Sequence, residues 1–242
     1  MKITGAQIVI KTLKKEGVNV LFGFPGGAVI PIFDELYRHK KNFRIFLPRH
    51  EQGGAHAADG YARVTGKVGV LIVTSGPGAT NTITGIATAY MDSVPLVVIT
   101  GQVPTYLIGS DAFQEVDVVG LTTPITKANF LVKNVDELAF TLKLAFHLAQ
   151  TGRPGPVVVD IPLDIQKTKT EFAYPTETEL KSFPVKEHPR PLQMKKAIDL
   201  IKQSRRPLVI CGGGVYISQA MNELNEFINK FNSFQRTNCR LH

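Results

Sequence analysis

The stretch that decides the fold is residues 68–81, which read VGVLIVTSGPGATN. Its first six residues form a continuous apolar run rich in β-branched side chains, which predicts a strand covered on both faces, as in a parallel sheet. The glycines and the proline that follow predict a turn that opens a helix. A second apolar run, PLVVI at 95–99, comes after a helical pattern over 79–91. The two runs are therefore expected to be parallel strands joined by a crossover helix.

The same alternation extends in both directions from this stretch. Helices are expected over residues 4–16, 28–40 and 136–150, and strands over 18–23 and 157–161. Such an alternating order predicts the α/β class, with a doubly wound parallel sheet. We assign this domain to residues 1–165, a length typical of one domain.

The pattern changes after this domain. Residues 166–190 are rich in Thr, Lys, Glu and Pro, which predicts a linker. Residues 191–231 then predict a helix, a strand, a glycine turn and a helix, the incomplete start of a second α/β domain. Residues 232–242 show neither helical nor strand periodicity and are expected to be an irregular tail. Two explanations stay open for it, an out-of-frame or truncated sequence and an ordinary frayed end.

Composition narrows the class of protein. The chain has 242 residues, is 43% hydrophobic and carries a formal net charge of +8. The basic residues are dispersed and no aromatic residues are interleaved with them, so we expect no nucleic-acid partner. No apolar run approaches the roughly 20 residues that span a bilayer, so we expect no membrane partner and a cytoplasmic location. Cys211 and Cys239 are far apart, and neither a disulfide framework nor a metal cluster is expected.

Glu51 is the candidate catalytic carboxylate. It follows an apolar stretch that ends at Leu47 and precedes a helical run from Gly53 to Arg63. A carboxylate at such a strand-to-helix junction suits both the helix N-terminus and the crevice at the strand ends. A simple N-terminal helix carboxylate that binds backbone N–H groups is the alternative reading of the same position.

Five segments together resemble a known family. They are GFPGG at 23–27, RHEQ at 49–52, AADGYAR at 57–63, TSGPGATN at 74–81 and DAFQE at 111–115. In this order and spacing they resemble the N-terminal domain of thiamine-diphosphate enzymes, most closely the large, catalytic subunits of acetolactate synthases. The resemblance covers roughly residues 1–230.

The resemblance implies roles for individual residues. Glu51 would hydrogen-bond the pyrimidine ring of thiamine diphosphate and so activate the cofactor, and Gly26 would lie beside the reactive region. Pro77 and Asn81 would lie near the aminopyrimidine ring. Phe113 and Gln114 would line the substrate site, with Gln114 offering amide hydrogen bonds to the reacting carbonyl groups.

Two further ligands are implied by the resemblance. FAD, largely structural in this family, would be held by Arg153 and by the turn Gly212, Gly213 and Gly214. Mg²⁺ would bind the diphosphate through a Gly-Asp-Gly segment and a later Asn. This chain contains no Gly-Asp-Gly segment, so we expect the Mg²⁺ ligands to be absent from it and the isolated chain to be inactive.

The implied reaction decarboxylates pyruvate and joins the two-carbon unit to a second 2-keto acid, giving 2-acetolactate for branched-chain amino acid synthesis. The resemblance also implies a homodimer or tetramer in a full-length form and a possible regulatory small subunit. Pyruvate oxidase, glyoxylate carboligase, sulfoacetaldehyde acetyltransferase and a non-catalytic fragment remain as alternatives. A nicotinamide-binding domain fits poorly, because no strand leads into Gly-x-Gly-x-x-Gly.

Overall fold

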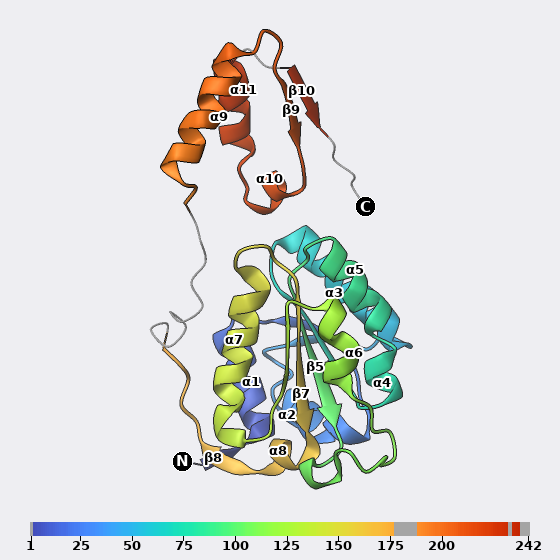
Figure 1. Ribbon diagram of the computed structural model, residues 1–242. Helices are drawn as coiled ribbons and strands as arrows, with labels where there is room; N and C mark the ends of the chain where they lie inside the picture. Colours follow the sequence, from blue (N-terminus) through green and yellow to red (C-terminus); the bar gives the residue numbers. More distant parts are fainter. Residues whose placement is uncertain (1, 177–187, 232–233, 238–242) are drawn as a thin grey trace. The chain divides into compact units, whose positions relative to one another are not determined.

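A computed structural model describes residues 2–176, 188–231 and 234–237, of which the last four are described by their backbone alone. The chain divides into two compact units, residues 1–185 and 186–242. Figure 1 shows both units coloured along the sequence, and each unit is described by itself.

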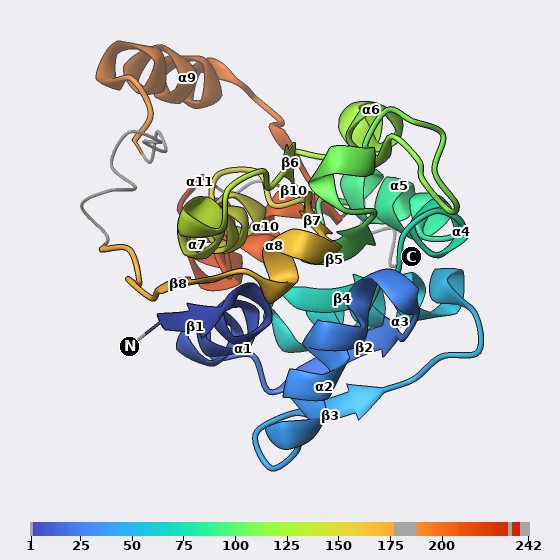
Figure 2. The same cartoon turned by 90° about the horizontal axis from the view of Figure 1, so that it is seen from below.

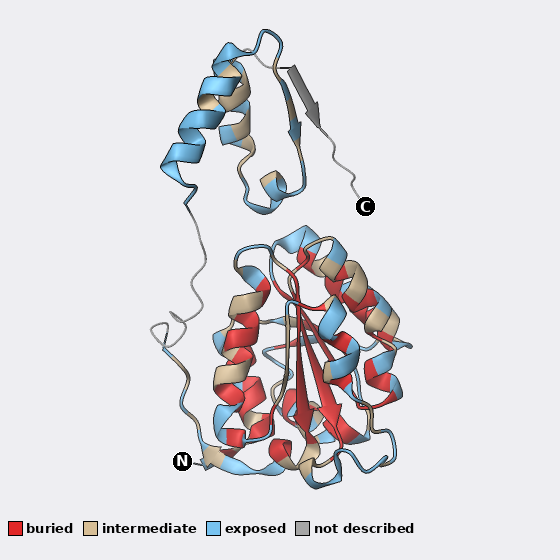
Figure 3. Ribbon diagram, viewed as in Figure 1, coloured by how far each residue is buried: buried red, intermediate tan, exposed pale blue. Residues whose placement is uncertain are grey.

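Unit 1 is built on a six-stranded sheet in which every pair of neighbouring strands is parallel. In order across the sheet the strands are β3 (Arg44–Phe46), β2 (Val20–Phe24), β4 (Gly69–Val73), β5 (Leu96–Gln102), β7 (Pro156–Pro162) and β6 (Ala128–Leu131). All residues of β4, β5 and β7 are buried, as Figure 3 shows for the centre of the sheet. Burial on both faces explains why their sequences are continuously apolar.

Helices cover both faces of this sheet (Figures 1 and 2). One apolar core joins the sheet to α1 (Gly5–Lys15), α2 (Ile30–Arg38) and α7 (Leu138–Gln150), and a second joins it to α3 (Glu51–Thr65) and α5 (Ile83–Met91). Smaller helices are α4 (Pro77–Thr80), α6 (Val118–Thr122) and α8 (Leu163–Lys167), with 3-10 turns at Gly27–Val29, Thr105–Leu107, Thr123–Ile125 and Val135–Glu137. The predicted doubly wound α/β class is confirmed.

Local chemistry sets several boundaries. Thr4 caps α1 in a reciprocal capping box with Gln7, and Gly17 follows the helix with a positive φ of 72°. The helix expected over 79–91 is two helices, because the chain turns at Asn81 and Thr82 between α4 and α5. This break matters for the site, since it leaves Asn81 at the end of a single helical turn.

The segment after β7 differs from the prediction of a linker over 166–190. Residues 163–167 form α8, and β8 (Lys169–Glu171) pairs antiparallel with β1 (Lys2–Thr4). The Gln166 side chain is completely buried. The polar composition of this segment hid its role, because Gln166 is buried and binds backbone oxygen atoms, whereas Lys167, Lys169 and Glu171 are exposed. Residues 177–187 of the predicted linker lie outside the described part.

Unit 2 contains α9 (Pro191–Gln203), β9 (Leu208–Cys211), α10 (Gly214–Ile217), α11 (Met221–Phe231) and β10 (Phe234–Thr237). The structure differs from the irregular tail expected over 232–242, because residues 234–237 form a strand parallel to β9. Backbone pairing with β9, which side-chain periodicity does not reveal, organises this strand. Residues 232–233 and 238–242 lie outside the described part.

Among the described residues, no helix combines the length and apolar character needed to cross a membrane.

Candidate active site

The candidate site lies at the carboxyl ends of β2 and β4. After β2 the chain continues to β3 on one side, and after β4 it continues to β5 on the other side. The loops that leave β2 and β4 therefore run in opposite directions. In open α/β sheets such a switch in direction opens a crevice at the carboxyl ends of the strands, where ligands bind. The loop after β2 carries Gly26, and the loop after β4 carries Thr74 and Gly76.

Thr74 is buried and packs against two glycines, Gly26 and Gly78. A Cβ atom added at Gly26 would lie 2.5 Å from the Thr74 Cγ2 atom, and one added at Gly78 would lie 2.7 Å from it. The Ala28 backbone N–H donates to Thr74 Oγ1 at 3.1 Å. The loop after β2 is therefore pinned to the loop after β4 at a spacing that only glycine permits at these two positions.

Glu51 is the first residue of α3 and is only 9% exposed. Asn81 Nδ2 donates to Glu51 Oε2 at 3.0 Å. The other oxygen, Oε1, accepts no hydrogen bond from any residue that the structure describes. It lies 3.5 Å from the position that a Cβ atom would occupy on Gly78. One oxygen of a nearly buried carboxylate thus lies beside Gly78 without a partner among the described residues.

This geometry distinguishes the two readings of Glu51. The helix cap is His50, whose Nδ1 accepts the backbone N–H of Gln52 at 3.2 Å. Glu51 instead binds the side chain of Asn81, which comes from another helix. Glu51 is therefore not the residue that caps α3, and its side chain is bound by Asn81.

Gln114 reaches the same crevice from the loop between β5 and α6. Gly76 has a φ of 57°, and a Cβ atom there would lie 2.6 Å from the Gln114 carbonyl oxygen and 2.9 Å from its Cα. The Gln114 backbone therefore packs directly on the turn that precedes Pro77. Phe113, beside it, exposes 88% of its surface. The structure thus brings together Gly26, Glu51, Pro77, Asn81 and Gln114, with Phe113 at the outer edge.

Helix α8 binds the loop after β2 and the loop after β5, a function that sequence reasoning missed. The Gln166 side-chain amide donates to the backbone oxygen of Ala28 at 2.7 Å. The Asp164 carboxylate accepts the Thr105 backbone N–H at 3.0 Å and also its hydroxyl group. An acidic residue and an amide two positions apart, directly after a strand end, were the available signal.

Strand β7 carries a buried carboxyl group at Asp160, opposite Thr100 of β5. It accepts hydrogen bonds from the Thr100 hydroxyl at 2.6 Å and from the Gln102 amide at 3.0 Å. Burial raises the pKa of Asp160 to about 7, although these two hydrogen bonds act in the opposite direction. The Gln102 amide also donates to the Val116 carbonyl oxygen. Gln102 is the last residue of β5, so this bond joins β5 to the end of the loop that contains Gln114.

One flavin-site candidate belongs to unit 1 and the others belong to unit 2. Arg153 precedes β7 at the amino end of the sheet, where its guanidinium group donates to Ser93 Oγ at 2.7 Å and to the carbonyl oxygens of Tyr90 and Met91. The structure therefore does not bring Arg153 to the Glu51 crevice. Gly212, Gly213 and Gly214 follow β9 in unit 2, and a Cβ atom on any of them would meet nothing within 4 Å.

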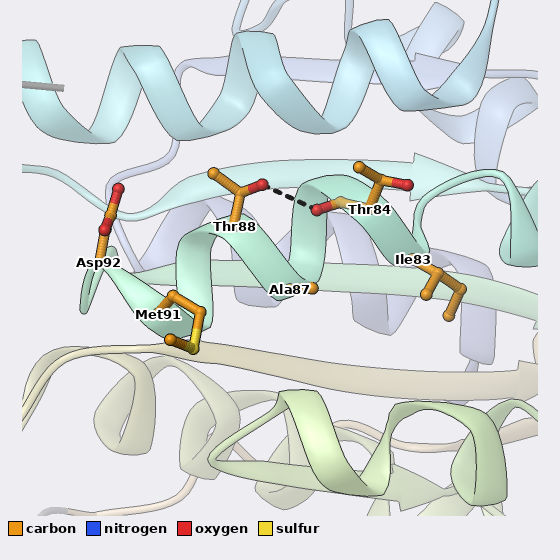
Figure 4. Close-up of a pocket in the computed structure, with 6 residues that line it drawn as sticks. All are labelled: Ile83, Thr84, Ala87, Thr88, Met91 and Asp92. Carbon is orange, nitrogen blue, oxygen red and sulfur yellow. Dashed lines mark hydrogen bonds between the residues drawn. The ribbon is translucent and has the colours of Figure 1, made fainter.

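A second hollow lies along the outer face of α5 (Figure 4). It is lined by Ile83, Thr84, Ala87, Thr88, Met91 and Asp92. Only one of these residues is titratable, and the dashed line in Figure 4 joins Thr88 to its own helix backbone. This surface therefore lacks the groups that acid–base chemistry needs. The described residues also contain no group of three or more His, Cys, Asp or Glu side chains arranged to hold a metal ion.

Two models of known protein families match the sequence of this chain. The family described as "Thiamine pyrophosphate enzyme, N-terminal TPP binding domain" matches residues 3–121, which contain the whole Glu51 crevice. The family described as "Thiamine pyrophosphate enzyme, central domain" matches residues 194–237. The chain belongs to the thiamine pyrophosphate enzymes. Thiamine pyrophosphate is the same compound as thiamine diphosphate.

Within the thiamine pyrophosphate enzymes, the chain is similar to acetolactate synthases. It is 52% identical over 223 residues to the probable acetolactate synthase large subunit of Methanocaldococcus jannaschii, a match that covers 91% of this chain and 37% of that protein. It is 51% identical to the acetolactate synthase of Mycobacterium bovis, over 93% of this chain and 36% of that protein. The large subunit from Buchnera aphidicola is 49% identical, over 95% and 40% respectively. The chain thus spans about two fifths of the length of these relatives.

Proposed function

We propose that this chain forms the pyrimidine-binding part of an acetolactate synthase catalytic subunit. The observation that carries the proposal is the Glu51 carboxylate, with Oε2 bound to Asn81 and Oε1 beside Gly78 without a partner among the described residues. Similarity to acetolactate synthase large subunits at about half identity supports the choice within the family.

The residues of the crevice fit a flat, polar ring. Gly26 and Gly78 let Thr74 pack directly against the backbone, because a Cβ atom at either position would clash with the Thr74 side chain. A nitrogen atom of the ring would meet Glu51 Oε1, the only oxygen of that carboxylate without a partner among the described residues. Asn81 holds the carboxylate in this orientation through its hydrogen bond to Oε2.

Thiamine diphosphate, when bound, supplies a nucleophilic carbon and an electron sink for decarboxylation. In the proposal Glu51 holds a proton at Oε1 and shares it with the ring nitrogen, the role of a general acid and base. Gln114 and Phe113 would contact the 2-keto acids, with the Gln114 amide donating to a carbonyl oxygen. The substrates are pyruvate and a second 2-keto acid, and the product with two pyruvates is 2-acetolactate.

The proposal includes further ligands and partners. FAD would contact Arg153 and the turn at 212–214, a suggestion that rests on sequence resemblance. Mg²⁺ would be bound by residues other than those described in this chain. A regulatory small subunit is a proposed partner, because several relatives are named large subunits. A homodimer or tetramer is proposed from the family resemblance alone. The expected cytoplasmic location completes the proposal.

A chimaera tests this function directly. The region of the Methanocaldococcus jannaschii subunit that aligns with this chain is replaced by this chain, so that the remainder of the enzyme comes from the relative. With pyruvate, thiamine diphosphate and Mg²⁺, the chimaera is expected to form 2-acetolactate. The parent subunit serves as the positive control.

The products separate the proposal from its alternatives. Acetyl phosphate and peroxide would indicate a pyruvate oxidase, and tartronate semialdehyde from glyoxylate would indicate a carboligase of that type. A folded chimaera that forms none of these products, beside an active parent, would contradict a catalytic function for this chain.

A further inference from the structure

The loop between β5 and α6, residues 103–117, has an unusual backbone around Gln114. Asp111 and Gln114 have φ angles of 55° and 58°, and Gly109 has a φ of 88°. Residues other than glycine seldom adopt positive φ, and the surrounding structure must hold them there. Something in this loop therefore fixes the turn that presents Phe113 and Gln114.

Glu115 provides that restraint. Its carboxylate accepts the backbone N–H of Gly109 through Oε1 and that of Ala112 through Oε2, the latter at 2.9 Å. The Glu115 backbone N–H in turn donates to the Ala112 carbonyl oxygen at 2.9 Å. One side chain thus closes the segment 109–115 into a ring, and Gln114 is one of the residues of that ring.

The electrostatics of Glu115 agree with this arrangement. Hydrogen bonds from the backbone N–H groups of Gly109 and Ala112, followed by those of Ser110 and Asp111, hold the pKa of Glu115 below its usual range. The carboxylate is therefore ionised at neutral pH, and its hydrogen bonds are of the stronger, charge-assisted kind.

The ring is connected to the crevice through Gln114. The Gln114 backbone packs on Gly76, where a Cβ atom would come within 2.6 Å of the Gln114 carbonyl oxygen. Gly76 immediately precedes α4, and the residue at the other end of α4, Asn81, binds Glu51. A displacement of the ring would therefore move Gln114 relative to the Glu51 carboxylate.

The two ends of the loop are held independently of Glu115. Thr105 is bound by Asp164 of α8, and the Val116 carbonyl oxygen is bound by the Gln102 amide. Loss of the Glu115 carboxylate would thus release the turn without releasing the loop or the fold.

We propose that Glu115 is a positioning residue, which holds the 109–115 turn so that Gln114 and Phe113 face the crevice. This inference rests on the proposed function for the meaning of the crevice, whereas the restraint itself does not depend on any activity. The substitution Glu115→Gln keeps the shape of the side chain and removes its charge.

Amide hydrogen exchange in the 242-residue chain tests the restraint. In Glu115→Gln the amides of Gly109 and Ala112 are expected to exchange at least about tenfold faster than in the unsubstituted chain. Amides of the buried strand β5 should keep their rates. Asp111→Asn is the matched control. It removes a carboxylate from the same loop, and that carboxylate accepts no hydrogen bond from the described residues. The exchange rates of the Gly109 and Ala112 amides should stay unchanged in this variant.

A spectroscopic signal reports the position of the presented side chain. The chain contains no tryptophan, so Phe113→Trp introduces a single indole at the tip of the turn. Its fluorescence anisotropy should fall when Glu115→Gln is added and should not fall with Asp111→Asn.

Unchanged exchange at Gly109 and Ala112 in Glu115→Gln would overturn the proposal. Equal acceleration by Glu115→Gln and Asp111→Asn would also overturn it, and so would acceleration spread through β5. None of these outcomes bears on synthase activity, so a failure here is distinct from a failure of the chimaera.

Discussion

Unit 1 and unit 2 are both built from helices and strands but differ in how far their apolar residues are buried. In unit 1 three neighbouring strands are buried along their whole length between two layers of helices. In unit 2 none of the residues 188–231 is buried, and Leu200, Leu208 and Ile210 are largely exposed. Periodicity predicts the helices and strands of both units, but burial depends on the number of strands and layers that assemble around them.

The difference locates the chemistry as well. A buried carboxylate such as Glu51 needs a packed frame around it. In unit 1 the loop after β2 is bound on one side by Thr74 and on the other by Gln166 of α8. The glycines of unit 2 lie in open space, whereas Gly26 and Gly78 lie against Thr74. A glycine turn in the sequence therefore indicates a site only where neighbouring atoms occupy the position that a Cβ atom would take.

The largest expected contrast is in the strand cores. Ile99 of β5 is fully buried and Ile210 of β9 is 68% exposed. Ile99→Ala should lower the free energy of unfolding of unit 1 by about 2–5 kcal/mol, because it leaves a cavity. Ile210→Ala should change stability by less than about 0.5 kcal/mol. Urea unfolding followed by circular dichroism measures both, and equal effects would remove the distinction between the units.

A smaller contrast is expected between two glycines. In Gly26→Ala the added methyl group would meet Thr74 at 2.5 Å, so overpacking should cost about 1–3 kcal/mol. Gly212→Ala adds a methyl group with no atom within 4 Å and should leave thermal unfolding almost unchanged. Equal stability of Gly26→Ala and Gly212→Ala would contradict the close packing of Gly26 against Thr74.

The pH dependence of stability offers the finest test. The folded-state pKa of Asp160 is raised from 3.8 to about 7, so the folded chain binds more protons than the unfolded chain between these values. The free energy of unfolding should therefore fall as pH rises from about 4 to 7, by at most about 1.4 kcal/mol per pH unit. Asp160→Asn should flatten this slope. A slope unchanged by the substitution would mean that Asp160 titrates normally.

Much of the fold was accessible from the sequence, because strands buried on both faces read as continuous apolar runs. The predicted strand at 157–161 lies within β7, and the predicted helix at 4–16 corresponds to α1 with its caps. The part that failed is α8 and β8, since the polar residues of 166–171 resemble a linker in composition. Gln166 is buried because it donates to Ala28, a contact between residues that are 138 positions apart.

The candidate site was only partly predictable. Glu51, Asn81 and Gln114 were identified by resemblance, and the structure places them around one crevice. Thr74, Asp164 and Glu115 were not identified as supporting residues, because their side chains bind backbone groups, and the fold decides which backbone groups lie within reach. The roles of Arg153 and the turn at 212–214 stay predictions.

The measurement that tests the central claim most directly compares two buried carboxylates in the active chimaera. Glu51→Gln should reduce the rate of 2-acetolactate formation at least about a hundredfold, because the proton at Oε1 is lost as a catalytic group. Glu35→Gln is the matched control, since Glu35 is equally buried but binds Gln7 and Arg38 away from the crevice, and its turnover should stay near that of the unsubstituted chimaera. Near-normal turnover by a folded Glu51→Gln chimaera would contradict the assignment of Glu51 and with it the proposed site.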